Sequence, residues 1–111
     1  MASAKSVVEE ERIVAVENRI KDFSEWLTSE YSLPKKVVKE YIDGIKNCSK
    51  YSVQYEIIDK SLFEINNKDI ISKCKAELFV KPVFKKLDER ANNLFAKAMD
   101  KYYLFIKEKE K

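Results

Sequence analysis

The chain is poor in the residues that make turns. It has 111 residues but only one glycine and two prolines. A sheet protein needs a turn about every 8–12 residues, usually built around glycine, proline, asparagine or aspartate. Apolar residues make up 45% of the chain and charged residues 37%, a balance typical of a folded helical domain. The composition therefore predicts an all-α protein, and the length allows one domain with a single modest core.

Histidine is absent, which weakens the case for an enzyme. Proton transfer near neutral pH most often uses histidine, and the chain has no glycine-rich loop that could cradle a nucleotide phosphate. The adjacent carboxylates Asp88 and Glu89 would point apart on a helix, so they form a poor acid–base pair. We therefore expect no catalytic residue and no cofactor in this chain.

Cys48 and Cys74 are the only cysteines, and they are far apart in the sequence. A structural zinc site normally needs four closely spaced ligands, so we expect no metal site. Both cysteines fall at apolar positions of predicted helices and should be buried and reduced. The sequence also lacks an apolar run of about 18 residues and an apolar signal core after Met1, which predicts no membrane contact and a cytoplasmic location.

The first apolar pattern covers residues 7–29, where apolar side chains recur three and four positions apart. It predicts one long helix, or two helices with a break near residues 17–20. We interpret residues 1–17 as an N-terminal helical arm and residues 18–107 as the helical domain. Residues 108–111 are expected to form a disordered tail.

Pro34 is well placed to begin the second helix, because its fixed φ suits a first helical turn. This helix should end near Lys46 or Cys48, and residues 49–60, with apolar side chains at near-alternate positions, predict a connecting loop. Further helices are predicted from Asn66 or Asn67 to Phe79, around residues 83–87, and from residues 88–91 to Ile106, after a short turn at residues 61–65. The expected architecture is a single small bundle of four to five helices.

Four segments of the chain follow one another in an order known from a protein family. Phe23-Ser24-Glu25-Trp26-Leu27 is an aromatic helical segment, and Ser61-Leu62-Phe63-Glu64-Ile65 is a turn. The other matching positions are Leu33, Val38, Tyr41, Ala96, Ala98, Met99, Tyr102, Phe105 and Ile106. In this order the segments resemble the N-terminal helical domain of bacterial restriction-type and related endonucleases. That domain is similar to the SAM-like core-binding domain of phage integrases.

The resemblance covers residues 18–107 and implies a DNA-binding accessory module without catalytic activity of its own. Such a module precedes a separate nuclease domain in the restriction-type proteins, and a small phage or defence protein is the other form that the resemblance suggests. The chain departs from the family pattern at Ser32, Pro34 and Val37, where the family has glycine, serine and threonine. Two polar groups that could cap the second helix or meet phosphate are therefore missing.

The positive charge of the chain comes mostly from lysine, and its excess lies after Leu33. Only three of the 22 basic residues are arginine. Lysine attracts phosphate, whereas arginine is the better reader of bases, so we expect weak, salt-dependent contact with the DNA backbone. The candidate phosphate contacts are Lys35, Lys36 and Lys39 on the second helix, Lys85, Lys86 and Arg90, and Lys97 and Lys101 on the last helix. An ordinary solvated helix surface is the alternative explanation for each cluster.

The tyrosines have two interpretations. They could stack on exposed bases, as in proteins that bind single strands, or pack in the core with the hydroxyl at the surface. Tyr102 has helical spacing beside other apolar residues and is expected in the core. Tyr51 and Tyr55 fall in the predicted loop, where both interpretations stay open.

The alternative function is protein–protein interaction or oligomerisation through residues 7–20. The apolar pattern there is long for a small core to cover, so part of it could meet a partner helix. The acidic character of this region, set against the basic remainder, is compatible with self-association.

Overall fold

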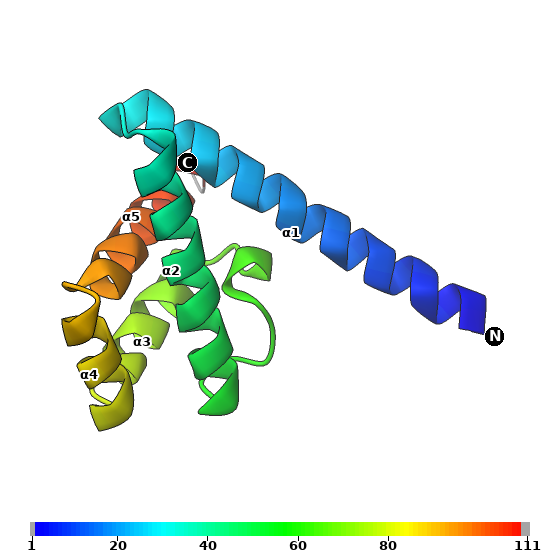
Figure 1. The fold of residues 1–111 in the computed structure, drawn as a ribbon. Coiled ribbons are helices and arrows are strands. Elements are labelled where there is room, and N and C mark those ends of the chain that lie inside the picture. The colour runs from blue at the N-terminus through cyan, green and yellow to red at the C-terminus, as the bar shows by residue number, and fades with distance from the viewer. Residues whose placement is uncertain (1, 110–111) are drawn as a thin grey trace.

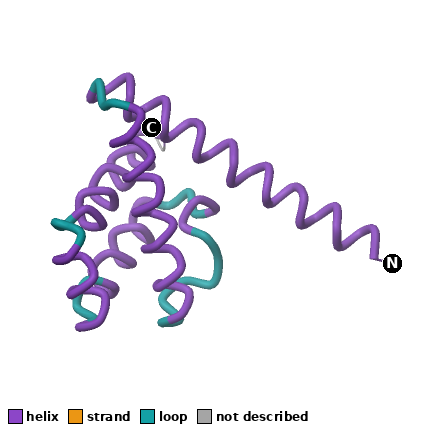
Figure 2. Tube along the Cα trace, viewed as in Figure 1, coloured by secondary structure: helices purple, strands orange, loops and turns teal. Residues whose placement is uncertain are grey.

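A computed structural model describes the backbone of residues 2–109 and the side chains of residues 10–109. The elements along this part of the chain are α1 (Ala2–Tyr31), α2 (Lys35–Gln54), the 3₁₀ helix η1 (Leu62–Glu64), α3 (Lys68–Leu78), α4 (Pro82–Arg90) and α5 (Leu94–Lys109). The described residues contain helices and loops but no strand (Figure 2). The predicted all-α class and the predicted bundle of four to five helices are confirmed.

Helix α1 is one continuous helix and has no break near residue 17. No glycine or proline interrupts it between Ala2 and Tyr31. It ends where Ser32 takes a φ of 52° and donates its N–H to the carbonyl of Thr28 at 3.0 Å. Its C-terminal half lies across the bundle, whereas its N-terminal turns extend away from the other helices (Figure 1).

Helix α2 extends to Gln54, so the predicted end near Lys46 or Cys48 is wrong. The loop predicted over residues 49–60 begins only at Tyr55. The near-alternate apolar residues suggested a loop because two serines were not counted toward the buried face. Ser49 and Ser52 are buried on α2 together with Cys48. The Ser49 hydroxyl accepts the Leu62 N–H at 3.0 Å, and Ser52 Oγ lies 2.9 Å from Cys74 Sγ. The helix ends before Glu56, whose φ is 59°.

Helices α2 and α5 pack closely at the centre of the bundle, and Gly44 permits their approach. A Cβ placed on Gly44 would lie 3.1 Å from Ala98 Cβ and 3.6 Å from Phe95 Cδ1. A separation of 3.1 Å between two Cβ atoms is shorter than ordinary van der Waals contact, so an added side chain would force Ala98 to shift. The single glycine of the chain therefore lies where α5 approaches α2 closely.

Side-chain caps fix the starts of the shorter helices. Ser61 and Glu64 form a capping box on η1, and the Asn67 side chain accepts the N–H groups of Asp69 and Ile70 at the start of α3. Of the two asparagines that the sequence offered as caps for α3, Asn67 is the cap. Helix α4 has Pro82 in its first turn, where the missing N–H of proline costs no helical hydrogen bond.

The last helix starts at Leu94, later than the predicted start at residues 88–91. Residues 88–90 belong instead to α4, and Asn92 and Asn93 take φ values of 56° and 62° that separate the two helices. At its other end α5 continues through Lys109, so residues 108 and 109 are helical where we expected a disordered tail. Residues 110 and 111 lie outside the described residues.

Candidate nucleic-acid interface

The lysines at the start of α2 are exposed, as the prediction requires. Lys35 and Lys39 are one turn apart and lie on the same side of the helix. Lys36 follows Lys35 directly and therefore points about 100° away from it. The three lysines are neighbours in sequence, but only two of them share a face of the helix.

Two further lysines continue the line of Lys35 and Lys39 along α2. Lys46 and Lys50 follow at intervals of seven and four residues, which keeps all four on one side of the helix. All four are exposed. We call Lys35, Lys39, Lys46 and Lys50 the α2 lysine stripe. It spans about 22 Å of helix axis at 1.5 Å per residue.

Carboxylates of the described residues lie near the α2 lysine stripe but do not pair with it, and Glu17 and Glu64 line the same surface hollow as Lys46. Within the described part of the chain, none of its four ammonium groups lies in an ion pair, and Lys50 lies 5.8 Å from the centre of the Tyr51 ring. Asp43 is the nearest acidic neighbour by helical spacing, since it is one turn from both Lys39 and Lys46. Lys46 and Lys50 are not among the contacts predicted from the sequence, because those lysines were grouped by closeness in sequence and not by side of the helix.

The candidate cations on α5 are partly engaged with other groups. Lys97 is exposed, whereas the Lys101 ammonium lies 3.9 Å from the centre of the Tyr31 ring. This cation–π contact holds Lys101 against the end of α1. Of this pair, Lys97 is the one that remains without such a contact among the described residues.

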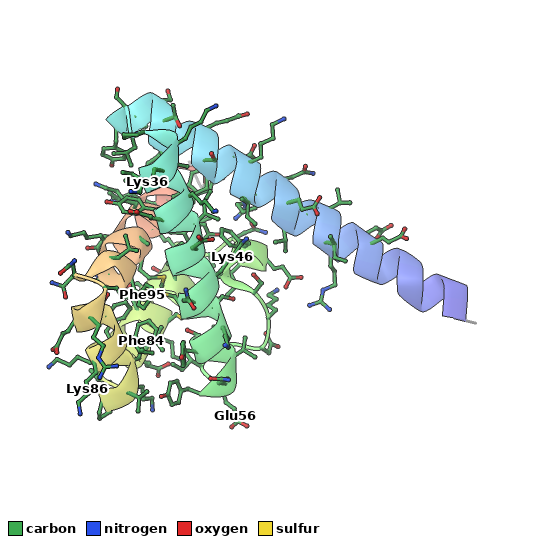
Figure 3. The ribbon with its side chains drawn as sticks, in the orientation of Figure 1. Lys36, Lys46, Glu56, Phe84, Lys86 and Phe95 are labelled. Carbon is green, nitrogen blue, oxygen red and sulfur yellow. The ribbon has the colours of Figure 1, made fainter. Side chains whose placement is uncertain are left out.

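The candidate cations on α4 lie away from the lysines at the start of α2. Lys85, Lys86 and Arg90 are all exposed, and Lys86 and Arg90 are one turn apart on one side of α4. Figure 3 shows Lys36 near the upper end of α2 and Lys86 at the opposite, lower end of the bundle. The structure therefore separates Lys86 from Lys36 and does not bring all the predicted site residues together as one patch.

The helix N-termini differ in whether they are open to an anion. The N-cap of α2 is Pro34, which offers no side-chain hydrogen bond to the first turn. The start of α5 is closed, because the buried Asp88 carboxylate accepts the N–H groups of Phe95 and Ala96 at 2.9 and 3.2 Å. The first-turn N–H groups of α2, beside Lys35 and Lys36, are therefore available to an anion. Those of α5 are already bound to the Asp88 carboxylate.

The three tyrosines considered from the sequence are buried or half-buried in the structure. Tyr102 is fully buried, and its hydroxyl donates to the carbonyl of Leu62 at 2.9 Å. Burial raises the pKa of Tyr102 to about 12, although Arg19 acts in the opposite direction. Tyr51 lies on α2 with its ring edge against Phe84, and Tyr55 is half-buried below the Lys81 ammonium. The expectation that Tyr102 is a core residue is confirmed, and Tyr51 is not in a loop.

The two thiols are unsuited to nucleophilic chemistry. Cys48 and Cys74 are both free and buried, as expected. Burial is the main cause that raises the pKa of both thiols, and for Cys48 the neighbouring Cys74 and Asp88 add to it. A thiol with a raised pKa stays protonated near neutral pH and is a poor nucleophile.

Two other features are absent from the described residues. They hold no group of three or more histidine, cysteine, aspartate or glutamate side chains placed to bind a metal ion. Among their helices, none has an apolar stretch long enough to cross a membrane.

The arrangement that remains is a line of lysines beside an open helix N-terminus. Such a surface attracts phosphate groups but carries little that could read bases. Comparison of the chain with protein-family models, with curated proteins and with solved structures gave no match.

Proposed function

We propose that the chain binds double-stranded DNA through its phosphate backbone, without catalysis, and that the α2 lysine stripe is the main contact. The observation that carries this proposal is the alignment of Lys35, Lys39, Lys46 and Lys50 on one exposed side of a single helix. Their spacing along about 22 Å of helix matches a polyanion better than a small anion, because a small anion would reach only one pair of lysines whereas successive phosphates can meet all four. The resemblance of four segments to an integrase-type domain favours DNA as the polyanion.

The composition of the surface indicates how such binding would behave. Lysine contributes a strongly hydrated point charge and makes few base-specific hydrogen bonds. Binding through lysine alone is therefore expected to be weak, largely independent of sequence and steeply dependent on salt. Lys97, Lys101, Lys85, Lys86 and Arg90 are proposed as secondary contacts on neighbouring faces.

The test is fluorescence anisotropy with a labelled duplex over a series of salt concentrations. Changing Lys35, Lys39 and Lys46 together to glutamine removes three charges and keeps a good helix former. The slope of log affinity against log salt should become shallower by about 0.9 for each phosphate contact removed, or about 2.7 in all. Asp43→Asn, which removes the carboxylate beside the stripe, should tighten binding.

The matched control changes three exposed lysines away from the stripe, Lys60, Lys73 and Lys107, to glutamine. It alters the net charge by the same amount and should leave the slope close to that of the unchanged chain. Equal losses in the two triple variants would mean that only net charge matters and would contradict the assigned surface. Binding that does not respond to salt would contradict the proposal as a whole.

A further inference from the structure

A surface hollow of about 540 Å³ lies between the second half of α1 and the end of α5. Asp22, Glu25 and Trp26 line it from α1, and Phe105 and Glu108 line it from α5. Spacings of three and four residues place the α1 side chains on one side of that helix, and the α5 side chains are likewise one turn apart. The hollow is therefore built from one face of each helix.

The hollow is acidic, although the chain as a whole has a net charge of +3. The carboxylates of Asp22, Glu25 and Glu108 line it together with a single ammonium group, that of Lys109, so its net charge is −2. Glu25 forms no ion pair with another described residue. These carboxylates do not converge as metal ligands, since the described residues hold no metal-binding group of three or more. They suit a cation whose charges are spread along a chain.

Ammonium groups of the chain itself already lie on the aromatic rings of this surface. The Lys109 ammonium is 5.1 Å from the centre of the Phe105 ring and 3.5 Å from an Asp22 carboxylate oxygen. The centre of the Trp26 ring lies 5.5 Å from that of Phe105 and 5.4 Å from that of Tyr31, which holds a second lysine of α5. No described ammonium lies over Trp26, although indole is the best cation–π acceptor of the three rings. Lys109 thus marks one place where an ammonium group binds, and Trp26 leaves room for another.

We propose that this hollow binds an aliphatic amine with two ammonium groups on one short methylene chain, independently of DNA. The side chains of Asp22 and Glu25 are one turn apart on α1, about 5–6 Å at their Cβ atoms. By ordinary bond lengths, two ammonium groups joined by four methylene groups are about 6 Å apart. One ammonium group meets Glu25, and the other displaces the Lys109 ammonium from Asp22. The methylene groups between them lie against the apolar surface of Trp26.

The test is an NMR titration of the nitrogen-15-labelled full chain with 1,4-diaminobutane, at constant ionic strength and without nucleic acid. Trp26 is the only tryptophan, and its indole N–H donates to Glu108 at 2.7 Å, so one signal reports from within the hollow. That signal and the backbone signals of residues 22–29 should shift and saturate. The comparison ligand is n-butylamine, which has one ammonium group on the same carbon chain. It should bind about two- to fivefold more weakly.

Two variants with matched controls test the assigned groups. Glu25→Gln removes the carboxylate without an ion pair and should weaken the binding of 1,4-diaminobutane about two- to fivefold. Its control is Glu89→Gln, an exposed carboxylate on α4. Lys109→Gln removes the competing ammonium group and should tighten binding by a similar factor. Its control is Lys107→Gln, which removes an exposed lysine of the same helix that does not line the hollow.

Three results would overturn the inference. One is the absence of saturable shifts among the residues that line the hollow. Another is equal affinity for 1,4-diaminobutane and n-butylamine, because one ammonium group would then account for all of the binding. The third is equal behaviour of each variant and its control, which would assign the binding to net charge. Tighter binding by Lys109→Gln than by Lys107→Gln would support displacement of the chain's own ammonium group.

Discussion

Asp88 shows how the role of a single residue depends on its place in the fold. In the sequence it is one of two adjacent carboxylates, and we interpreted the pair only as a poor acid–base dyad. In the structure Asp88 is 6% exposed and belongs to α4, yet it caps the start of α5 across the Asn92–Asn93 turn. Its neighbour Glu89 is exposed. Asp88 therefore has a structural role as a helix cap, whereas Glu89 is a surface residue.

Asp88→Ala should lower the free energy of unfolding by about 2 kcal/mol, because it leaves the buried N–H groups of Phe95 and Ala96 without an acceptor. Asp88→Asn keeps one oxygen acceptor and should lose less. Urea unfolding measures the effect, and Glu89→Ala on the same helix serves as the control, with an expected change within about 0.5 kcal/mol. Equal midpoints for the two alanine variants would show that the cap does not stabilise α5.

At the scale of helices, the sequence predicted which elements exist better than where they end. Apolar spacing identified α1, α3 and α5, and Pro34 marked the start of α2, because both signals are local. The end of α2 was missed because Ser49 and Ser52 are buried through partners on other elements, Leu62 and Cys74, which no local pattern reveals. The α2 lysine stripe was visible in the sequence through helical spacing. That its ammonium groups form no ion pair with another described residue could be seen only in the fold.

The contact between α2 and α5 depends on two small residues, Gly44 and Ala98. Gly44→Val should lower the free energy of unfolding by about 1–3 kcal/mol, because the added carbons would meet Ala98 and Phe95 on α5. Asp43→Val on the same helix is the control, since Asp43 is exposed and valine and aspartate have similar helix propensities. Thermal or urea unfolding of the two variants gives the comparison. A loss for Asp43→Val as large as that for Gly44→Val would mean that contact with α5 is not what limits the side chain at position 44.

At the scale of the whole molecule, the course of α1 across the bundle is held at several points. The Arg12 guanidinium contacts both carboxylate oxygens of Glu64 on η1, and Arg19 donates to the Ile65 carbonyl and to Asn66. Toward its C-terminal end, the Trp26 indole N–H donates to Glu108 at 2.7 Å. These contacts set the direction in which the N-terminal turns of α1 leave the bundle.

The pair formed by Arg12 and Glu64 makes the attachment of α1 dependent on pH. The hydrogen bond from Arg12 is the main cause that lowers the pKa of Glu64 below its ordinary value of 4.5. A carboxylate with a lowered pKa contributes stability that is fully present above the ordinary value and is lost as the pH falls through the lowered pKa. Glutamine at position 64 retains an oxygen for the Ser61 N–H of the capping box but cannot pair with Arg12 as an anion.

Glu64→Gln should therefore be less stable than the unchanged chain at pH 7, by an amount on the order of 0.5 kcal/mol because the Arg12 side chain is largely exposed. The difference should shrink as the pH falls below 4.5 and vanish once Glu64 is protonated in the folded protein. Urea unfolding at a series of pH values gives this comparison, and Glu56→Gln in the exposed α2–η1 loop should differ little from the unchanged chain throughout. A gap between the Glu64 variant and the unchanged chain that persists in acid would assign the loss to the capping box, because the charge of the Arg12 pair is absent there.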